Sequence, residues 1–337
     1  AIIAERYTYM PSIGFSMMLG YGILWIWEHP RKDISKFKKP IIIILSLWVI
    51  FISIVTWKRI GVWRRGDYLF EDILLNYQNQ PFVYNNLGFV CFNELKDYER
   101  ALYNYNRCIA IDSTFDIVYS NRGILYFNTG KYPEALKDFN VALRLKPDNT
   151  NAYLGRANTL SSLGRYKESI PDYDTYLASI KDNAMAYKWR GVAKYQTGFY
   201  ENAIVDFNTA IVMQPSEYEP YYWRGLTLYA EKKTDEAIKN LSEAIARDNT
   251  RNELFAWRGL MYYNKGQIDA AMTDYNSAIA INPKDVASLV NRSNVYRDKK
   301  QYDKALADLQ TVAALGQSVD KKYFEEIAAK ASSMSKR

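Results

Sequence analysis

The sequence predicts an all-α protein in which two transmembrane helices precede a right-handed superhelix of seven helix-turn-helix repeats and a capping helix. Two observations carry this prediction. A small residue recurs with a period of about 34 residues, and two uncharged apolar runs lie before the array. The small residues are Gly88, Gly123, Ala157, Gly191, Gly225, Gly259 and Ser293. A fixed period of this length is typical of stacked helical pairs that bury one continuous core.

Residues 119–147 show how one repeat is built. Tyr119, Gly123 and Tyr126 lie on one stripe of the first expected helix, at helical spacing. Gly130 ends that helix, because glycine adopts left-handed dihedral angles at little cost. Alanines in the second expected helix let the two helices approach closely, and a proline ends it.

These large, small and turn residues resemble the tetratricopeptide repeat. The resemblance covers about residues 82–317 as seven units. Residues 318–337 are then expected to form a capping helix and tail, and residues 61–81 a juxtamembrane linker with a half-repeat helix. The resemblance implies a protein-protein interaction scaffold, because such arrays bind partners along a concave face.

Arginine and aspartate recur together in the array. An arginine precedes the small residue in six units, at Arg122, Arg156, Arg190, Arg224, Arg258 and Arg292. An acid lies in the second helix of five of these units, at Asp138, Asp172, Asp206, Asp274 and Asp308, and Asn240 takes the remaining place. The arginines could bind anions of a partner, or they could form ion pairs between neighbouring helices. Their recurrence with the acids favours the ion pairs.

Residues 1–60 are predicted to form a membrane region. Residues 8–27 and 40–57 are uncharged and apolar, with Trp and Tyr near their ends. At roughly 1.5 Å per residue each run just spans a hydrocarbon layer of ~30 Å. Because no small-residue cleavage site follows the second run, a signal peptide is the less favoured interpretation.

Charge predicts the location. Residues 28–65 hold nine basic and two acidic side chains, which accounts for the whole net charge of +7. The array is therefore neutral overall, unlike a nucleic-acid binder. The positive-inside rule places the basic loop in the cytoplasm. The sequence thus predicts an integral membrane protein, in a bacterial inner membrane, with its repeats on the periplasmic or lumenal side and the lipid bilayer as a partner.

The first residues carry a second resemblance. The motif AERYTYMPSIGF is similar to a segment near the end of the membrane region of TMTC-type O-mannosyltransferases, which have the GT-C architecture and tetratricopeptide tails. It implies that the chain is the C-terminal part of such a glycosyltransferase, whose repeats present the acceptor protein. Glu5 and Arg6 are the catalytic-region candidates: Arg6 could bind the phosphate of a lipid-linked sugar, or the two could form an interfacial ion pair. The family's catalytic acids would lie upstream of Ala1.

Other chemistry is not indicated. The single histidine, His29, cannot form a histidine-based metal cluster, and no phosphate loop or nucleophile elbow is present. We therefore expect no cofactor and no metal, and the sequence alone does not establish an enzyme. Cys91 and Cys108 could form a disulfide, but two buried thiols are favoured because disulfide geometry is demanding.

The tetratricopeptide resemblance also implies which side chains line the groove. They are aromatic or amide residues: Asn93, Asn128, Asn158, Trp189, Tyr195, Trp223, Tyr229, Trp257, Tyr263 and Asn264. Rings give contact area at low entropic cost, and amides hydrogen-bond peptide backbones or sugar hydroxyls. Alternatively, some rings pack between repeats. Two functions remain open: a membrane-anchored scaffold that binds a polypeptide, or the acceptor-presenting tail of a glycosyltransferase.

Overall fold

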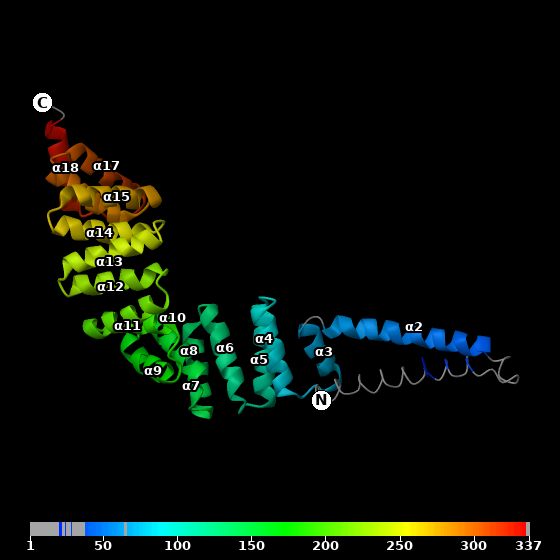
Figure 1. Cartoon of the computed structure of the whole chain (residues 1–337). Coiled ribbons are helices and arrows are strands. Elements are labelled where there is room, and N and C mark those ends of the chain that lie inside the picture. The colour runs from blue at the N-terminus through cyan, green and yellow to red at the C-terminus, as the bar shows by residue number, and fades with distance from the viewer. Residues whose placement is uncertain (1–19, 22–23, 25–27, 29–37, 64–65, 335–337) are drawn as a thin grey trace. The chain divides into compact units, whose positions relative to one another are not determined.

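The computed structural model describes residues 20–21, 24, 28, 38–63 and 66–334 (Figure 1). Seventeen helices and no strand lie in this part of the chain. The chain forms two compact units, residues 1–90 and residues 91–337. The first unit contains α2 (Lys38–Trp63), α3 (Gly66–Asn76) and most of α4 (Pro81–Asn93). The described fold is therefore all-α.

The prediction of two transmembrane helices is wrong. The apolar run at residues 40–57 lies in α2, but lysines at positions 39 and 58 end its uncharged part on both sides. At ~1.5 Å per residue this run is about 27 Å long, which is at the lower limit for a hydrocarbon core of ~30 Å. Among the helices of the described residues, none combines the length and the apolar character needed to cross a bilayer.

The predicted membrane location depended on those two spans. The predictions of an integral membrane protein, of a bilayer partner and of a periplasmic or lumenal array are not supported, because no helix of the described residues could cross a bilayer. Most of the other predicted span, residues 8–27, lies outside the described residues, as do Glu5, Arg6 and His29.

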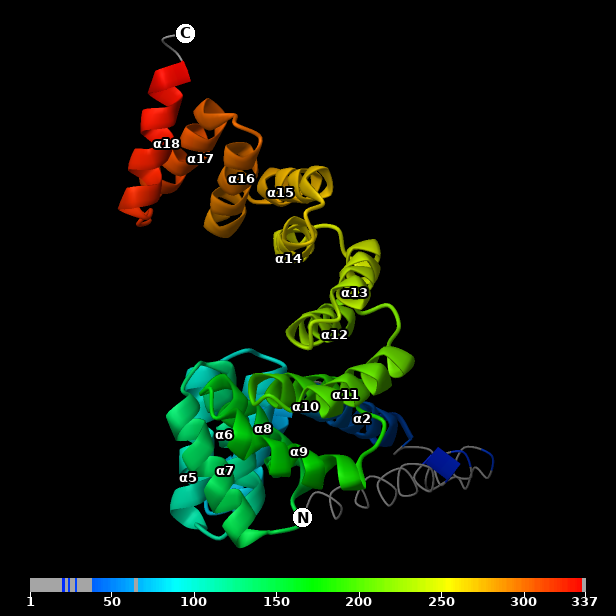
Figure 2. The same cartoon turned by 90° about the vertical axis from the view of Figure 1, so that its left-hand side faces the viewer.

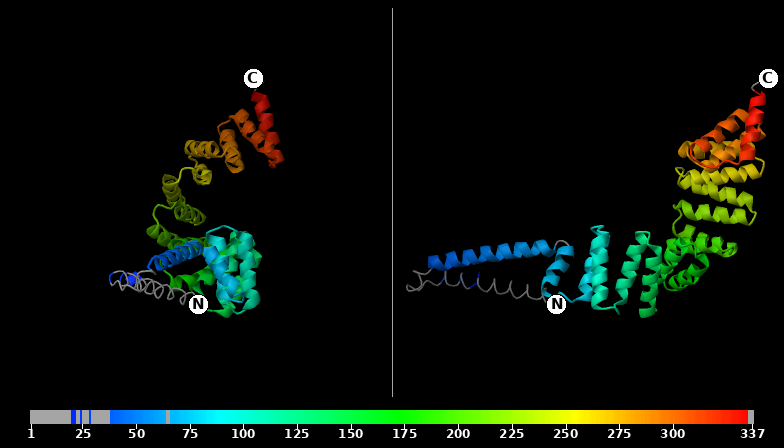
Figure 3. Two further views of the ribbon diagram at one scale, coloured as in Figure 1. Left: turned by 90° about the vertical axis from the view of Figure 1, so that its right-hand side faces the viewer. Right: turned by 180° about the vertical axis from the view of Figure 1, so that it is seen from behind.

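Helix pairs in the second unit follow the sequence period. Their first helices begin at equal intervals along the chain: α6 (Asp116–Asn128), α8 (Thr150–Ser162), α10 (Ala184–Gln196), α12 (Tyr218–Ala230), α14 (Asn252–Asn264) and α16 (Val286–Asp298). The second helices keep the same interval: α5 (Tyr98–Ile111), α7 (Tyr132–Leu145), α9 (Tyr166–Ser179), α11 (Tyr200–Met213), α13 (Thr234–Arg247), α15 (Ile268–Ile281) and α17 (Tyr302–Ala314). The last helix is α18 (Lys321–Met334). From α5 onward, each helix packs against the next in the chain (Figures 2 and 3).

The turn inside each pair needs one residue with a positive φ angle. Gly130 provides it after α6 with φ of 74°, as its place in the repeat predicts. Lys232 and Lys300 take the same place after α12 and α16, with φ of 64° and 58°. A residue with a Cβ atom pays roughly 1–2 kcal/mol for this conformation, so these two turns are less favourable locally.

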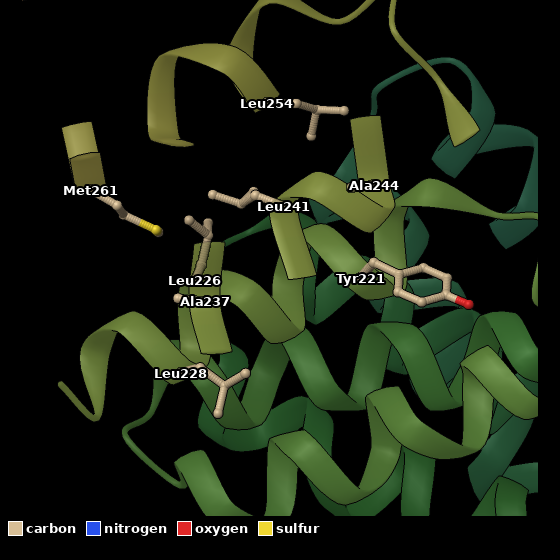
Figure 4. Close-up of a cluster of buried hydrophobic side chains, with 8 residues drawn as sticks. All are labelled: Tyr221, Leu226, Leu228, Ala237, Leu241, Ala244, Leu254 and Met261. Carbon is tan, nitrogen blue, oxygen red and sulfur yellow. The ribbon is translucent and has the colours of Figure 1, made fainter. Parts of the chain in front are cut away.

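The core is shared between successive repeats. One cluster of buried side chains joins α12, α13 and α14, so it belongs to two neighbouring helix pairs (Figure 4). Its members are Tyr221, Leu226, Leu228, Ala237, Leu241, Ala244, Leu254 and Met261. A single pair could not bury these side chains without its neighbour, which is why the units must stack.

The arginine ladder, formed by the six arginines and their acceptors, joins the two helices of each pair. Five of the arginines donate Nε and Nη2 to both carboxylate oxygens of the aspartate 16 residues later, over 2.6–2.9 Å. Arg156 and Asp172 are one example, between α8 and α9. The structure therefore shows the ion-pair alternative for these five arginines.

Each arginine also reaches a third helix. Its Nη1 donates to a side chain 16 residues earlier, in the second helix of the preceding repeat, over 2.6–2.9 Å. The acceptors are Asn106, Asn140, Asp174, Asn208, Ser242 and Asn276. The sequence did not reveal this column, because amide, hydroxyl and acid share it and all of them resemble ordinary surface residues. One guanidinium thus connects three helices from two repeats.

The ladder contributes more to geometry than to net stability. The paired aspartate side chains are only 2–8% exposed, and their arginines 16–25%. Desolvation offsets much of the attraction in such a pair, whereas removal of one partner leaves an uncompensated charge. We infer that the planar fork sets the angle and register between helices.

We predict that Asp172→Asn lowers the free energy of unfolding by about 1–3 kcal/mol, because the half-buried Arg156 then lacks a counter-charge. The matched control is Arg156→Met with Asp172→Leu, which removes both charges and should stay within about 1 kcal/mol of the wild type. Urea unfolding followed by circular dichroism measures both. An unchanged Asp172→Asn variant would contradict the clamp.

Candidate functional site

The candidate site is the aromatic face, which we define as Trp189, Trp223, Trp257, Tyr195, Tyr229 and Tyr263. The three tryptophans take the same place in α10, α12 and α14, and so do the three tyrosines, each one repeat period apart. All six side chains are half-buried, so each combines a packed part with an accessible part. The face is therefore a regular set of rings across three successive repeats.

Contacts between repeats hold the tyrosines. The ring of Tyr195 lies 5.8 Å from the ring of Trp223, measured between centroids. Asn264 donates from Nδ2 to the hydroxyl of Tyr229 over 2.6 Å. Tyr263 donates its hydroxyl to Asp298 over 2.6 Å. Each tyrosine thus contacts a residue of the following repeat.

Trp223 and Trp257 pack on the preceding repeat, whereas Trp189 packs on residues of its own repeat. Trp223 packs against the cluster that contains Phe207 of α11, and Trp257 against the cluster that contains Leu241 of α13. Position 155 in α8 is equivalent to these tryptophans, and it holds glycine. A Cβ atom there would lie 2.4 Å from the Phe139 ring. The alternative in which rings pack between repeats therefore describes one side of Trp223 and of Trp257.

Two further contributors were missed in the sequence. Tyr222 packs edge-on against Trp223, with ring centroids 5.2 Å apart, and packs against the same buried cluster as Trp257. Lys188 lies 4.9 Å from the centre of the Trp189 ring and pairs with Glu219 of the next repeat. Neither residue recurs with the period of the array, so the repeat pattern contained no signal for them.

The hydroxyl groups of Tyr195 and Tyr222 are neutral at physiological pH. Burial raises the pKa of Tyr222 to about 12 and raises the pKa of Tyr195 above its usual value. Tyrosine hydroxyls that keep their proton can donate as well as accept hydrogen bonds. The chemistry that the face offers is therefore ring contact and neutral hydrogen bonding.

The structure does not bring all of the predicted groove residues together. Asn158 accepts a hydrogen bond from the hydroxyl of Tyr173 over 2.7 Å, inside its own repeat. Asn128 is exposed at the end of α6, where Nδ2 donates to the carbonyl of Ile124 over 2.8 Å. Asn93 is exposed at the end of α4. The aromatic face thus involves the repeats of α10 to α15 and not the earlier ones.

Cysteine and metal chemistry add nothing to the site. Cys91 and Cys108 are both fully buried. Within the part of the chain that the structure describes, no group of three or more His, Cys, Asp or Glu side chains could hold a metal ion. The lipid-linked sugar prediction depended on Glu5 and Arg6, which lie outside that part.

Family comparisons agree with this repeat geometry. One family model described as "Tetratricopeptide repeat" matches residues 117–149. A second model with the same description matches residues 154–218 and 190–252. A third, described as "TPR repeat", matches residues 91–130 and 259–292. Together these matches cover more than half of the chain. The chain belongs to the tetratricopeptide repeat family.

Individual relatives are more distant. Protein O-mannosyl-transferase TMTC3 of Homo sapiens is 30% identical over 146 residues, which is 43% of this chain and 15% of that protein. A lipoprotein NlpI homolog of Haemophilus influenzae is 32% identical over 85 residues, 25% of this chain and 27% of that protein. The chain thus matches only a small part of the length of these relatives. A tetratricopeptide repeat protein from Parabacteroides merdae aligns with TM-score 0.57 and 18% identity, over 75% of this chain and 98% of its own, which shows the fold alone.

We predict that Gly155→Ala destabilises the array by about 1–3 kcal/mol, because the added methyl group overlaps the Phe139 ring. The double variant with Phe139→Leu should lose less than the sum of the two single changes. Gly164→Ala is the control: its φ of +73° makes alanine unfavourable, but nothing lies within 4 Å of the added atom. Urea unfolding measures all four variants. If the costs of Gly155→Ala and Phe139→Leu simply add, the close packing is refuted.

Proposed function

We propose that the chain is a protein-interaction scaffold that binds an extended polypeptide segment along the aromatic face. One observation carries the proposal. Two kinds of ring, tryptophan and tyrosine, repeat at fixed places in three successive repeats and stay partly accessible. Core packing alone does not require this regularity, because Gly155 takes the tryptophan place in α8.

The chemistry of the face suits a polypeptide backbone. Rings provide contact area and lose little conformational entropy when they bind. Neutral hydroxyls and the exposed amide of Asn264 can pair with backbone N–H and C=O groups, which need partners when they leave water. Neighbouring first helices lie roughly 10 Å apart, so three repeats extend over about 20 Å and match about six residues of extended chain.

We predict that peptides selected from a random 12-residue phage library on this chain lose at least 10-fold in affinity on Trp257→Ala, which is the size expected for a central aromatic anchor. Because Trp257 also packs on the core, a second variant is needed. Asn264→Ala removes an exposed side chain and its hydrogen bond to Tyr229, and it should weaken binding about 3-fold while lowering the melting temperature much less than Trp257→Ala does.

Isothermal titration calorimetry gives the affinities. Phe199→Ala is the matched control, because Phe199 is an exposed aromatic residue, 53% accessible, outside the aromatic face. Its effect should be less than 2-fold. If the selected peptides respond to Phe199→Ala and not to Trp257→Ala or Asn264→Ala, they bind elsewhere and the proposed function fails.

A second candidate is favoured by the similarity to several O-mannosyl-transferases, which are 27% to 30% identical over short parts of their length. Here the aromatic face would hold an acceptor protein for a glycosyltransferase. Binding far from the reacting atoms lowers KM without a need to alter the chemical step.

For this candidate we predict that the intact gene product transfers mannose to a serine-containing peptide that binds the aromatic face. Trp257→Ala should raise KM at least 5-fold and leave kcat unchanged. A scrambled peptide of the same composition is the control. Transfer that is absent, or that proceeds equally well with the scrambled peptide, would leave the scaffold function alone.

A further inference from the structure

The arginine ladder changes at one position. Arg224 in α12 meets Asn240 where the other five arginines meet an aspartate. Its Nε donates to Oδ1 of Asn240 over 2.7 Å and its Nη1 to Oδ1 of Asn208 over 2.6 Å. Asn240 turns its own Nδ2 to the carbonyl of Glu236. Among the described residues, Nη2 of Arg224 has no acceptor, although this atom binds a carboxylate oxygen in the other five.

The charge of Arg224 is not neutralised. The guanidinium carbon of Arg224 lies 5.5 Å from the centre of the Tyr221 ring, and that of Arg247 lies 3.8 Å from it. Glu243 pairs with Arg247, over 2.7 Å, which leaves one positive charge in excess. Burial lowers the pKa of Arg224, whereas hydrogen bonds with Asp172 raise the pKa of Arg156. A half-buried cation without a counter-charge is costly, so an added carboxylate would be stabilising.

The surroundings of Arg224 are open and apolar. Asn208, which Arg224 contacts, is exposed on α11. Val205 and Val212 lie three residues before and four residues after it, on the same face of the helix, and are 61% and 81% exposed. The equivalent residues of α7 are Lys137 and Arg144. Arg224 therefore contacts a residue of α11 that is flanked on its helix face by two exposed apolar side chains.

We propose that Arg224 is a carboxylate-binding site that takes an aspartate or glutamate side chain of a partner polypeptide, with Val205 and Val212 in contact with apolar residues on either side of that acid. In the other five arginines the equivalent Nη2 atom binds one carboxylate oxygen, and this is the contact left open at Arg224, where Asn240 already occupies Nε. The site is formed by Arg224 of α12 together with residues of the second helices α11 and α13, so it differs from the aromatic face, whose six rings all lie on first helices. It stands independently of the proposed peptide groove.

Sodium acetate is the first probe, titrated into the full chain labelled with ¹⁵N-arginine, at constant ionic strength held with sodium chloride. We expect the Nε–H signal of Arg224, assigned with Arg224→Lys, to shift with acetate and saturate. The signals of Arg122, Arg156, Arg190, Arg258 and Arg292 should move at least 5-fold less. Asn240→Asp supplies the carboxylate from within the chain and should abolish the shift.

Asp274→Asn is the matched variant that opens the same site at Arg258, and it should make the Arg258 signal respond to acetate. Equal shifts at all six arginines, or a response that persists in Asn240→Asp, would overturn the site.

The second probe distinguishes a free acid from a polypeptide. The peptide acetyl-Leu-Glu-Leu-amide should bind at least 10-fold more tightly than acetate, and its Gln counterpart should not displace acetate from Arg224. Val212→Ser should reduce peptide affinity towards that of acetate. If peptide and acetate bind equally well, the site takes small carboxylates and a polypeptide partner is excluded.

Discussion

The bidentate pairing of arginine with aspartate, repeated along the array, is the interaction on which the rest of the structure depends. Each guanidinium connects a first helix to its own second helix and to the second helix of the preceding repeat. A planar fork tolerates little rotation, so it relates three helix axes at once. Hydrophobic packing supplies most of the stability, but it is compatible with several helix angles. The fork selects one of them, and the regular period of the repeats then carries it through the array.

This constraint decides what the aromatic residues can do. With the spacing of the first helices set, a tryptophan two residues before the small residue can touch the preceding repeat, as Trp223 does near Phe207. A tyrosine six residues later reaches the following repeat, as Tyr229 does through Asn264. The same ring therefore contributes to the array on one side and presents a surface on the other. Each of these positions therefore combines a packed side with an accessible side.

The sequence predicted the features in which one residue type recurs, and it missed those in which several residue types have the same role. The period, the turn at Gly130 and the Arg156–Asp172 pairing could all be predicted, because each needs one kind of side chain. The third ladder contact was missed, since asparagine, aspartate and serine all serve as its acceptor. The membrane prediction relied on the length of two apolar runs; the run in α2 reaches only about 27 Å between its flanking lysines, and no helix of the described residues could cross a bilayer. The aromatic face could be located but not divided into packed and accessible parts.

The repeat of α12 and α13 departs most from the pattern, and its departures are connected. It lacks the aspartate, so Arg224 has only amide acceptors, and hydrogen bonds between neutral acceptors and a cation are weaker than a charged fork. The same repeat contains Tyr222 and Trp223 and packs against Trp257 of the next one. We infer that ring packing replaces the missing ion pair in holding this repeat to its neighbours. A partner that binds these rings would then contact the repeat of α12 and α13, whose geometry the ladder constrains least. Binding there would therefore be coupled to the angle between this repeat and its neighbours.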